Sequence, residues 1–264
     1  MVAHLWDLPF VTRVTTTVHA QSPEQTIIHI KNWHLVSKKL FTADLRDQDP
    51  LLSDDAIERS YESHLAEVEK VQQEQLALLR SLIRHHGLKS VYLEGMTELD
   101  RPVVEAKVGG LRDVEKHLPS LREELKATRD EIEMLGEKGG FPELVDLRIE
   151  LETVIKEHRT EMLRIGAAGQ LHVLGELEAI LPLDDLDAYR AANPLRDGGQ
   201  IVLDQDAIEA REDAQVRILL RGNRVSVILL GGAHDLADNV RRLAEGKVEL
   251  LVVETQGYRL AAGH

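Results

Sequence analysis

The sequence predicts an α/β protein with an open, mainly parallel sheet that is flanked by helices and interrupted by an inserted antiparallel helical hairpin. Three short apolar runs alternate with helical stretches, and each leads into a polar residue; the runs are Thr26–Ile30, Ser90–Leu93 and Val225–Leu230. Such runs are typical of parallel strands that are buried on both faces. Ligands of these sheets bind beyond the carboxyl ends of the strands, so we expect the functional site there.

The composition narrows the functional classes. The 264 residues are 43% hydrophobic and 30% charged, and a chain of this length can form one α/β core with an insertion or two small domains. A formal net charge of −14 works against binding nucleic acid, because that affinity comes largely from Lys and Arg contacts to phosphates. Without cysteine, any metal must be held by His, Asp or Glu. No apolar stretch approaches the ~20 residues that span a bilayer, and no secretory leader is evident, so we expect a cytoplasmic protein without a membrane partner.

The first elements have clear boundary signals. The Thr-rich segment Val11–Val18 is expected to be an edge strand or an extended arm. After the Thr26–Ile30 strand, Ser53 is expected to cap a helix that ends at Gly87, because apolar residues follow at helical spacing in between. The strand Ser90–Leu93 comes next. This order predicts a strand–helix–strand unit, which is almost always right-handed.

A helical hairpin is predicted between residues 111 and 165. Aliphatic residues alternate spacings of three and four through 111–136 and again through 142–165, on either side of Gly139-Gly140. We therefore divide the chain into an α/β core with the cleft, 1–110 and 166–264, and a hairpin insertion, 111–165. The pattern leaves three roles open for the hairpin: a cap over the cleft, an arm that forms a homodimer, or a stabilising insertion.

After the hairpin, alternating strands and helices are expected again. Leu171–Leu174 is the first apolar run, and it would place Glu176 at a strand end. The later elements are a helix, a strand, a second helix and a final strand, which are expected at about Asp204–Leu220, at Val225–Leu230, from about Asp235 and at Val248–Val253.

Two histidines and one glutamate are the leading site candidates. His234 follows Gly231-Gly232, and paired glycines let the backbone turn tightly and approach a ligand. His34 lies in the loop after the first buried strand, and Glu94 ends a buried strand, where a carboxylate is costly unless it is paired or binds a cation. Each has a structural alternative, namely a surface His after a glycine turn or a Glu in a salt bridge. Their joint occurrence at three strand ends favours a shared site.

Other polar residues are weaker candidates. His29 lies within the first buried strand and is expected to be a core imidazole. His85 and His86 are expected at a helix C-terminus, where they interact with the helix dipole. Glu176 and Glu254 hold expected strand-end positions in a less specific context.

These motifs together resemble a known superfamily. The resemblance is carried by a histidine loop after the first strand, a strand-end Glu in a Val-x-Leu-Glu context, an amphipathic helix with Arg211-Glu212-Asp213, and the segment Val227–His234. The chain is similar in these features to the superfamily of TraB and Tiki proteins, the haem-binding ChaN lipoproteins and the erythromycin esterases. The similarity covers most of the chain apart from the N-terminal arm.

The resemblance implies an α/β core with helical insertions and a cleft that holds two His and one Glu. In this sequence they are His34, Glu94 and His234, as catalytic residues and metal ligands. Arg211 would be a neighbour in the site and, with Gly231 and Gly232, would contribute to cofactor binding.

The first loop departs from the superfamily pattern, in which Gly, often followed by Glu, precedes the His. Lys31 and Asn32 stand in those places here. Asn is a poorer ligand than an acid, and a lysine ammonium opposes a nearby cation. We therefore expect a divalent metal, Zn²⁺ or Mn²⁺, to bind weakly and reversibly.

Three functions follow from these observations. The leading one is a hydrolase, an esterase or peptidase acting on a small-molecule or peptide substrate, in which the two His and the Glu activate a water with or without a divalent metal. The second, implied by the ChaN resemblance, is a protein that binds haem or another small ligand in the same cleft. The third is a non-catalytic scaffold whose hairpin docks a partner, which Lys31 in place of the glycine favours.

Overall fold

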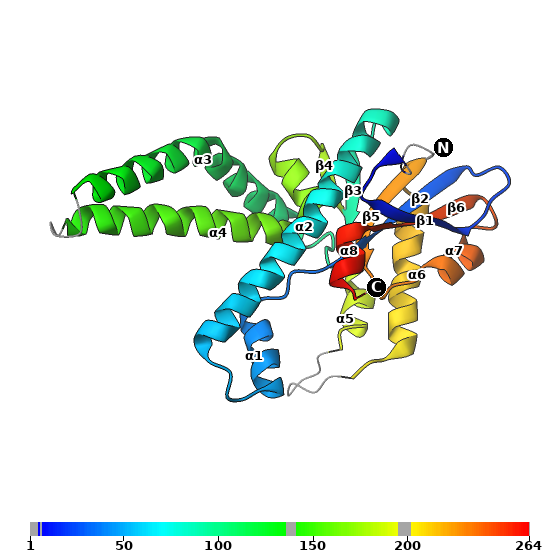
Figure 1. Ribbon diagram of the computed structural model, residues 1–264. Coiled ribbons are helices and arrows are strands. Elements are labelled where there is room, and N and C mark those ends of the chain that lie inside the picture. The colour runs from blue at the N-terminus through cyan, green and yellow to red at the C-terminus, as the bar shows by residue number, and fades with distance from the viewer. Residues whose placement is uncertain (1–4, 6, 136–140, 195–201, 264) are drawn as a thin grey trace.

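The computed structural model describes residue 5 and residues 7–135, 141–194 and 202–263. Its centre is a six-stranded sheet with the strand order β1-β6-β2-β5-β3-β4 and with helices on both faces (Figure 1). The strands are β1 Val11–Val18, β2 Gln25–Asn32, β3 Ser90–Leu93, β4 Ala179–Pro182, β5 Val225–Gly231 and β6 Val248–Thr255. β1 is an edge strand antiparallel to β6, and the other strand pairs are parallel. The predicted fold class is confirmed.

The described helices are α1 Lys38–Gln48, α2 Asp54–His86, α3 Arg101–Leu135, α4 Pro142–Val173, α5 Leu186–Ala191, α6 Gln205–Leu220, α7 Ala237–Leu243 and α8 Gln256–Ala261. The boundaries of α2 follow its predicted caps. The Ser53 side chain accepts a hydrogen bond from the Ala56 amide, and Gly87 ends the helix with a φ of +62°. Of the helices described, none combines the length and the apolar character needed to cross a bilayer.

The sheet is buried on both faces, which explains its nearly continuous apolar runs. Ile28 and Ile30 of β2 pack on one face with α2 and with the inner ends of α3 and α4. Ile27 packs on the opposite face with α6 and α7, because successive side chains of a strand point to opposite sides. His29 is also buried, and burial and then the nearby Lys31 lower its pKa to about 3. It is therefore the neutral core imidazole that the sequence predicts.

The order of the strands decides what lies at the carboxyl edge. The chain passes from β2 through α2 to β3, and β5 later returns to lie between them. Asn32 at the end of β2 pairs with Gly231 at the end of β5, and Leu93 at the end of β3 pairs with Leu229. Three connections far apart in the sequence therefore begin side by side.

α3 and α4 form the predicted antiparallel hairpin, which projects away from the sheet (Figure 1). Ion pairs between Arg129 and Glu152, and between Lys107 and Glu161, join its two arms. Both helices extend further towards the core than predicted. Gly166, with a φ of +70°, interrupts α4 where the hairpin meets the core. The predicted turn at Gly139-Gly140 lies outside the described residues.

One expectation after the hairpin is wrong. Leu171–Leu174 is not a strand, because 171–173 form the last turn of α4, and Glu176 is therefore not at a strand end. Glu176 instead accepts two hydrogen bonds from the Arg80 guanidinium. The small residues 167–169 let this buried helical segment pack close to the sheet core. A short apolar run is typical of a buried helix as well as of a buried strand, because neither element has a polar face.

Candidate functional site

The structure brings His34, Glu94 and His234 together at the carboxyl edge of the sheet. His34 follows β2, Glu94 follows β3 directly, and His234 follows β5. The Nε2 atom of His34 lies 3.1 Å from Glu94 Oε2, and the Nε2 atom of His234 lies 3.2 Å from Glu94 Oε1. The predicted convergence of these three side chains is thus confirmed, whereas their catalytic and metal-binding roles remain predictions.

Glu94 is the centre of this cluster. In addition to the two imidazoles, the backbone amide of Gly231 donates a 2.8 Å hydrogen bond to Glu94 Oε2. Burial by itself raises the pKa of Glu94, but the hydrogen bonds from His234 and His34 outweigh burial and hold this pKa well below its ordinary value. Glu94 is therefore an ionised carboxylate whose two oxygens each face one imidazole.

His234 lies between two carboxylates. Its Nδ1 atom is 2.7 Å from Glu212 Oε1, and its Nε2 atom faces Glu94. The hydrogen bonds to Glu212 and Glu94 raise the pKa of His234 to about 9, against the opposing effect of burial. His234 is then an imidazolium at neutral pH that donates from both nitrogens.

A chain of amides holds His34 from the other side. The side-chain amide of Gln75 donates to Asn32 Oδ1 at 3.0 Å, and Asn32 Nδ2 lies 3.4 Å from His34 Nδ1. Because Asn32 Oδ1 accepts from Gln75, the Asn32 NH2 group faces His34 and donates to its Nδ1. The proton of the neutral imidazole is then on Nε2, which donates to Glu94. The side chain of His34 is 54% exposed, so His34 is the more accessible of the two imidazoles.

The buried carboxylate of Asp184 holds Arg211 next to Glu94. The Arg211 guanidinium forms two hydrogen bonds with Asp184, at 2.6 and 3.0 Å, and lies 3.6 Å from Glu94 Oε1. Asp184 also accepts from Gln215 and from the Gly95 amide. Burial lowers the pKa of Arg211, but the Asp184 hydrogen bonds and charge more than compensate and raise it. Asp184 therefore ties α6 to the turn that follows Glu94.

Lys31 fixes the loop after β5. Its ammonium donates to the backbone carbonyl oxygens of Gly232 and His234, at 2.7 and 2.9 Å. Burial lowers the pKa of Lys31 against the opposing effect of nearby acids, first among them Asp235. Lys31 thus holds the backbone that carries His234.

Both glycines of this loop are needed for close approach. A Cβ atom at Gly231 would lie 2.9 Å from His34 Nε2, and one at Gly232 would lie 1.8 Å from the Tyr258 hydroxyl. Their role here is therefore to let His34 and Tyr258 pack against the backbone.

The cluster opens into a cleft of about 590 Å³. The segments that follow β2, β3 and β5 line it together with α8. The lining residues are Asn32, Trp33, His34, Val36, Glu94, Gly231, Gly232, Ala233, His234 and Tyr258. None of these lining residues belongs to the hairpin, so among the described residues the hairpin does not roof the cleft.

The donor atoms of this cluster match a divalent metal in kind but not in arrangement. Two imidazoles and one carboxylate suit Zn²⁺ or Mn²⁺, and Glu212 behind His234 resembles the carboxylate that commonly orients a metal-bound imidazole. Both Nε2 atoms instead face Glu94 in hydrogen-bonded ion pairs. Within residues 7–135, 141–194 and 202–263, no three His, Asp or Glu side chains are grouped so that they could hold a metal ion in the arrangement shown.

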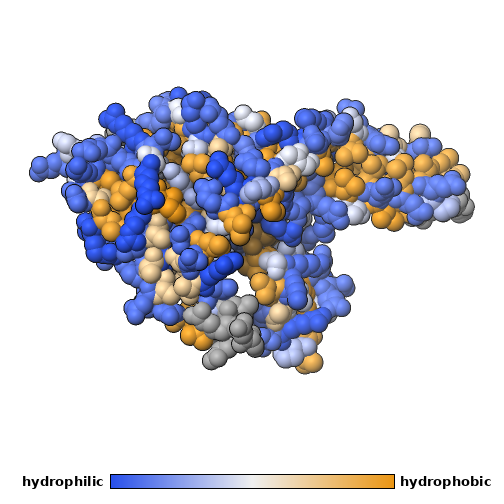
Figure 2. Space-filling model, turned by 180° about the vertical axis from the view of Figure 1, so that it is seen from behind, coloured by the Kyte–Doolittle hydropathy of each residue, from blue (hydrophilic) through white to orange (hydrophobic). Residues whose placement is uncertain are grey.

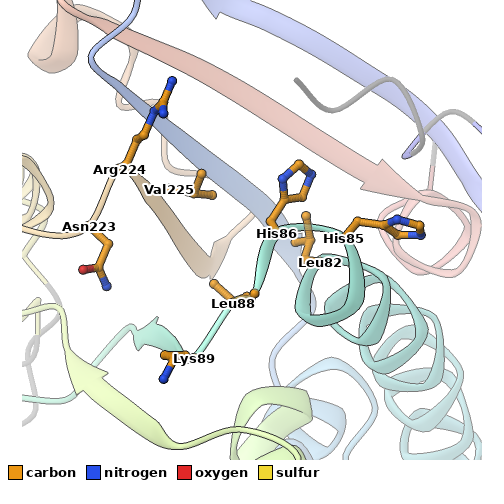
Figure 3. Close-up of a pocket in the computed structure, with 9 residues that line it drawn as sticks. Leu82, His85, His86, Leu88, Lys89, Asn223, Arg224 and Val225 are labelled. Carbon is orange, nitrogen blue, oxygen red and sulfur yellow. The ribbon is translucent and has the colours of Figure 1, made fainter.

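A second hollow, of about 730 Å³, lies at the opposite edge of the sheet (Figure 3). It lies between the C-terminal end of α2, where His85 and His86 occupy the last turn as predicted, and the start of β5 at Val225. It contains none of the three converging residues. The carboxyl-edge cleft is therefore the better candidate for chemistry, although it is the smaller of these two.

Sequence reasoning missed two residues of the site. Glu212 was noted only as part of the Arg211-Glu212-Asp213 motif, and Asp184 was not singled out. Both are at least nine-tenths buried. A signal for Glu212 was available, because Glu212, Gln215 and Leu219 recur at helical spacing and place the carboxylate on the buried face of α6.

Comparison of the chain with protein-family models, curated proteins and solved structures found no match.

Proposed function

We propose that the protein is a hydrolase that cleaves an ester or amide bond in the carboxyl-edge cleft. The observation that carries this proposal is the Glu94 carboxylate, which two imidazoles share while Glu212 holds one of them, His234, as a proton donor. Acid–base catalysis needs a proton donor and a proton acceptor within reach of one reacting group, and this cluster supplies both.

The roles of the two imidazoles differ. The Nε2–H···Glu94 contact of His234 is longer than its Nδ1–H···Glu212 contact, 3.2 against 2.7 Å, so the Nε2 proton is the one to transfer. His234 gives this proton to the leaving oxygen or nitrogen as its bond to the carbonyl carbon breaks. His34 takes a proton from the attacking water through Nδ1, whose present contact with Asn32 is a long 3.4 Å. Glu94 remains ionised and stabilises both imidazolium ions.

A divalent metal would need the same residues to rearrange, because the described residues form no group that could hold one as they stand. His34, Glu94 and His234 would hold it, and when bound it would lower the pKa of a coordinated water. For it to bind, His234 must lose its proton, and the high pKa of about 9 makes that costly at neutral pH. This cost, together with Lys31 in the adjoining loop, supports the expectation of weak, reversible binding.

The test measures hydrolysis of neutral esters and peptides by wild type, His234→Ala and Glu94→Gln, each with a chelator and with added Mn²⁺ or Zn²⁺. We expect both variants to lose about 10²–10⁴-fold in kcat, the usual contribution of one acid–base group. His85→Ala, which changes an imidazole in the other hollow, is the matched control and should retain activity. Wild-type activity that neither variant reduces would refute the proposal.

Haem or small-ligand binding is the second candidate. It is supported by the half-exposed imidazole of His34, which sits beside Trp33 and Val36 in the cleft wall. Absorbance in the Soret region after haem addition, lost in His34→Ala, would favour it over hydrolysis. If the protein shows neither hydrolysis nor ligand binding, the scaffold role remains.

We also propose that the outer end of the hairpin pairs with a second copy of the chain. Large apolar side chains are exposed there on both arms, namely Met134, Leu135, Phe141, Val145 and Ile149. Figure 2 shows apolar surface along the hairpin. Light scattering should report a dimer that Ile149→Glu converts to a monomer. A monomeric wild type at high concentration would contradict this pairing.

A further inference from the structure

The cleft wall beyond the acid–base residues is uncharged. Apart from Asn32, it consists of aromatic, aliphatic and small residues, namely Trp33, Val36, Gly231, Gly232, Ala233 and Tyr258. Apolar walls with a few polar groups are typical of sites for small ligands with an apolar part. Size and lining therefore favour a compact substrate that has an aromatic or aliphatic group.

The neighbouring cations are already engaged. Lys31 binds two backbone carbonyl oxygens, and Arg211 binds Asp184 in a two-pronged ion pair. His234 is held by Glu212 and Glu94. Among the described residues that line the cleft, no cation is left over for an anionic group of a substrate.

Trp33 carries an unused hydrogen-bond donor. Its indole Nε1 is buried and has no acceptor among the described residues. A buried donor without an acceptor is costly, and a ligand that supplies one relieves that cost. Trp33 lines the cleft between Asn32 and His34 in the chain, and its buried N–H reaches a ligand when the ring turns towards the cleft.

We propose that the cleft selects neutral esters that carry an apolar group and a second, uncharged carbonyl, and that Trp33 is the specificity-determining residue. This inference rests on the proposed hydrolase function. The indole N–H donates to the carbonyl oxygen that is not attacked, while the apolar group packs against Val36 and Tyr258. Water adds its oxygen to the ester carbon while His34 takes one of the water protons, the carbon–alkoxide bond breaks, and His234 protonates the leaving alkoxide to give the alcohol. The carboxylic acid product then loses its proton to His234, and His34 releases the water proton to solvent. The carboxylate product has no cation partner, which favours its release.

The test uses a matched pair of probes, N-acetylphenylalaninamide, which is neutral, and N-acetylphenylalanine, which is its anionic counterpart. The chain has two tryptophans, so Trp6→Phe leaves Trp33 as the single tryptophan whose emission reports binding. We expect the neutral amide to change this emission saturably and the anion to bind at least about tenfold more weakly. Calorimetry on Trp33→Phe, which keeps an aromatic ring but loses the N–H, should show about a tenfold loss of affinity for the amide, typical of one hydrogen bond.

The outcomes separate this inference from the proposed function. Equal binding of the two probes, or amide binding that Trp33→Phe leaves unchanged, overturns the selection even if esters are hydrolysed. Absence of binding by both fluorescence and calorimetry also overturns it. Selective binding without hydrolysis of N-acetylphenylalanine ethyl ester overturns the hydrolase proposal and leaves the selectivity of the cleft standing. Circular dichroism of the Trp33→Phe protein distinguishes lost binding from lost folding.

Discussion

Replacing Glu212 by Gln should remove the main cause of the unusual basicity of His234. Glu212 Oε1 accepts from His234 Nδ1 at 2.7 Å, and this contact is the largest of the effects that raise the His234 pKa from 6.5 to about 9. The difference between these two pKa values corresponds to about 3 kcal/mol in favour of the imidazolium in the folded protein. The substituted amide would keep the size and one acceptor but not the charge, so the His234 pKa should fall by about one unit or more, or roughly 1.4 kcal/mol.

The same shift sets a pH dependence of stability. A pKa that folding raises contributes its full stabilisation below the unfolded value of 6.5 and loses it as the pH rises through the folded value of about 9. Through this group, the free energy of unfolding of wild type should fall by up to about 3 kcal/mol between these pH values. Glu212→Gln should flatten that fall and lower stability at neutral pH.

The assay follows the His234 ring signals by NMR titration in the presence of a chelator, with urea unfolding at pH 6 and pH 9. Asp213→Asn is the matched control, because Asp213 lies on the same helix and pairs with Arg242 and Asn239 instead of His234. A His234 midpoint near 6.5 in wild type would refute the reasoning. The reasoning would also be refuted if the titration midpoint of His234 were no lower in Glu212→Gln than in Asp213→Asn.

Three further predictions concern the surroundings of the site. Asp184→Ala should lower the free energy of unfolding by about 3–5 kcal/mol in urea, because it leaves the guanidinium of Arg211 buried without its partner; a loss below about 1 kcal/mol would contradict the tie between α6 and the Glu94 turn. Gly232→Ala should cost about 1–3 kcal/mol, because its Cβ would lie 1.8 Å from the Tyr258 hydroxyl. Adding Tyr258→Phe should recover part of this loss, and no recovery would mean that the Tyr258 ring atoms at 2.7 and 2.9 Å, and not the hydroxyl, cause the clash. Calorimetric titration with Mn²⁺ and Zn²⁺ should show weak binding that His234→Ala abolishes, whereas equal binding by both proteins would place the metal elsewhere.

The candidate site was predictable in part because strand ends are visible in the sequence. His34, Glu94 and His234 each follow an apolar run, and parallel strands present their carboxyl ends at one edge. Glu212 and Asp184 were harder to find, because one lies within a helix and the other follows an edge strand, with no local feature to link either to the cleft. Their partners, His234 and Arg211, are 22 and 27 residues away along the chain.

The sequence by itself determined the elements whose signals are local. The caps at Ser53 and Gly87 and the heptad-like spacing of the hairpin depend on neighbours within a few residues. Both caps lie where predicted, and the hairpin forms as predicted although its helices extend further towards the core. The tertiary structure alone decided that β5 lies between β2 and β3, that Leu171–Leu174 belongs to the end of α4 instead of a strand, and that Glu212 faces His234. The reason is physical. Strand order and buried ion pairs are fixed by contacts between residues far apart in the chain, and those contacts compete with one another over the whole fold and leave no periodic trace in the sequence.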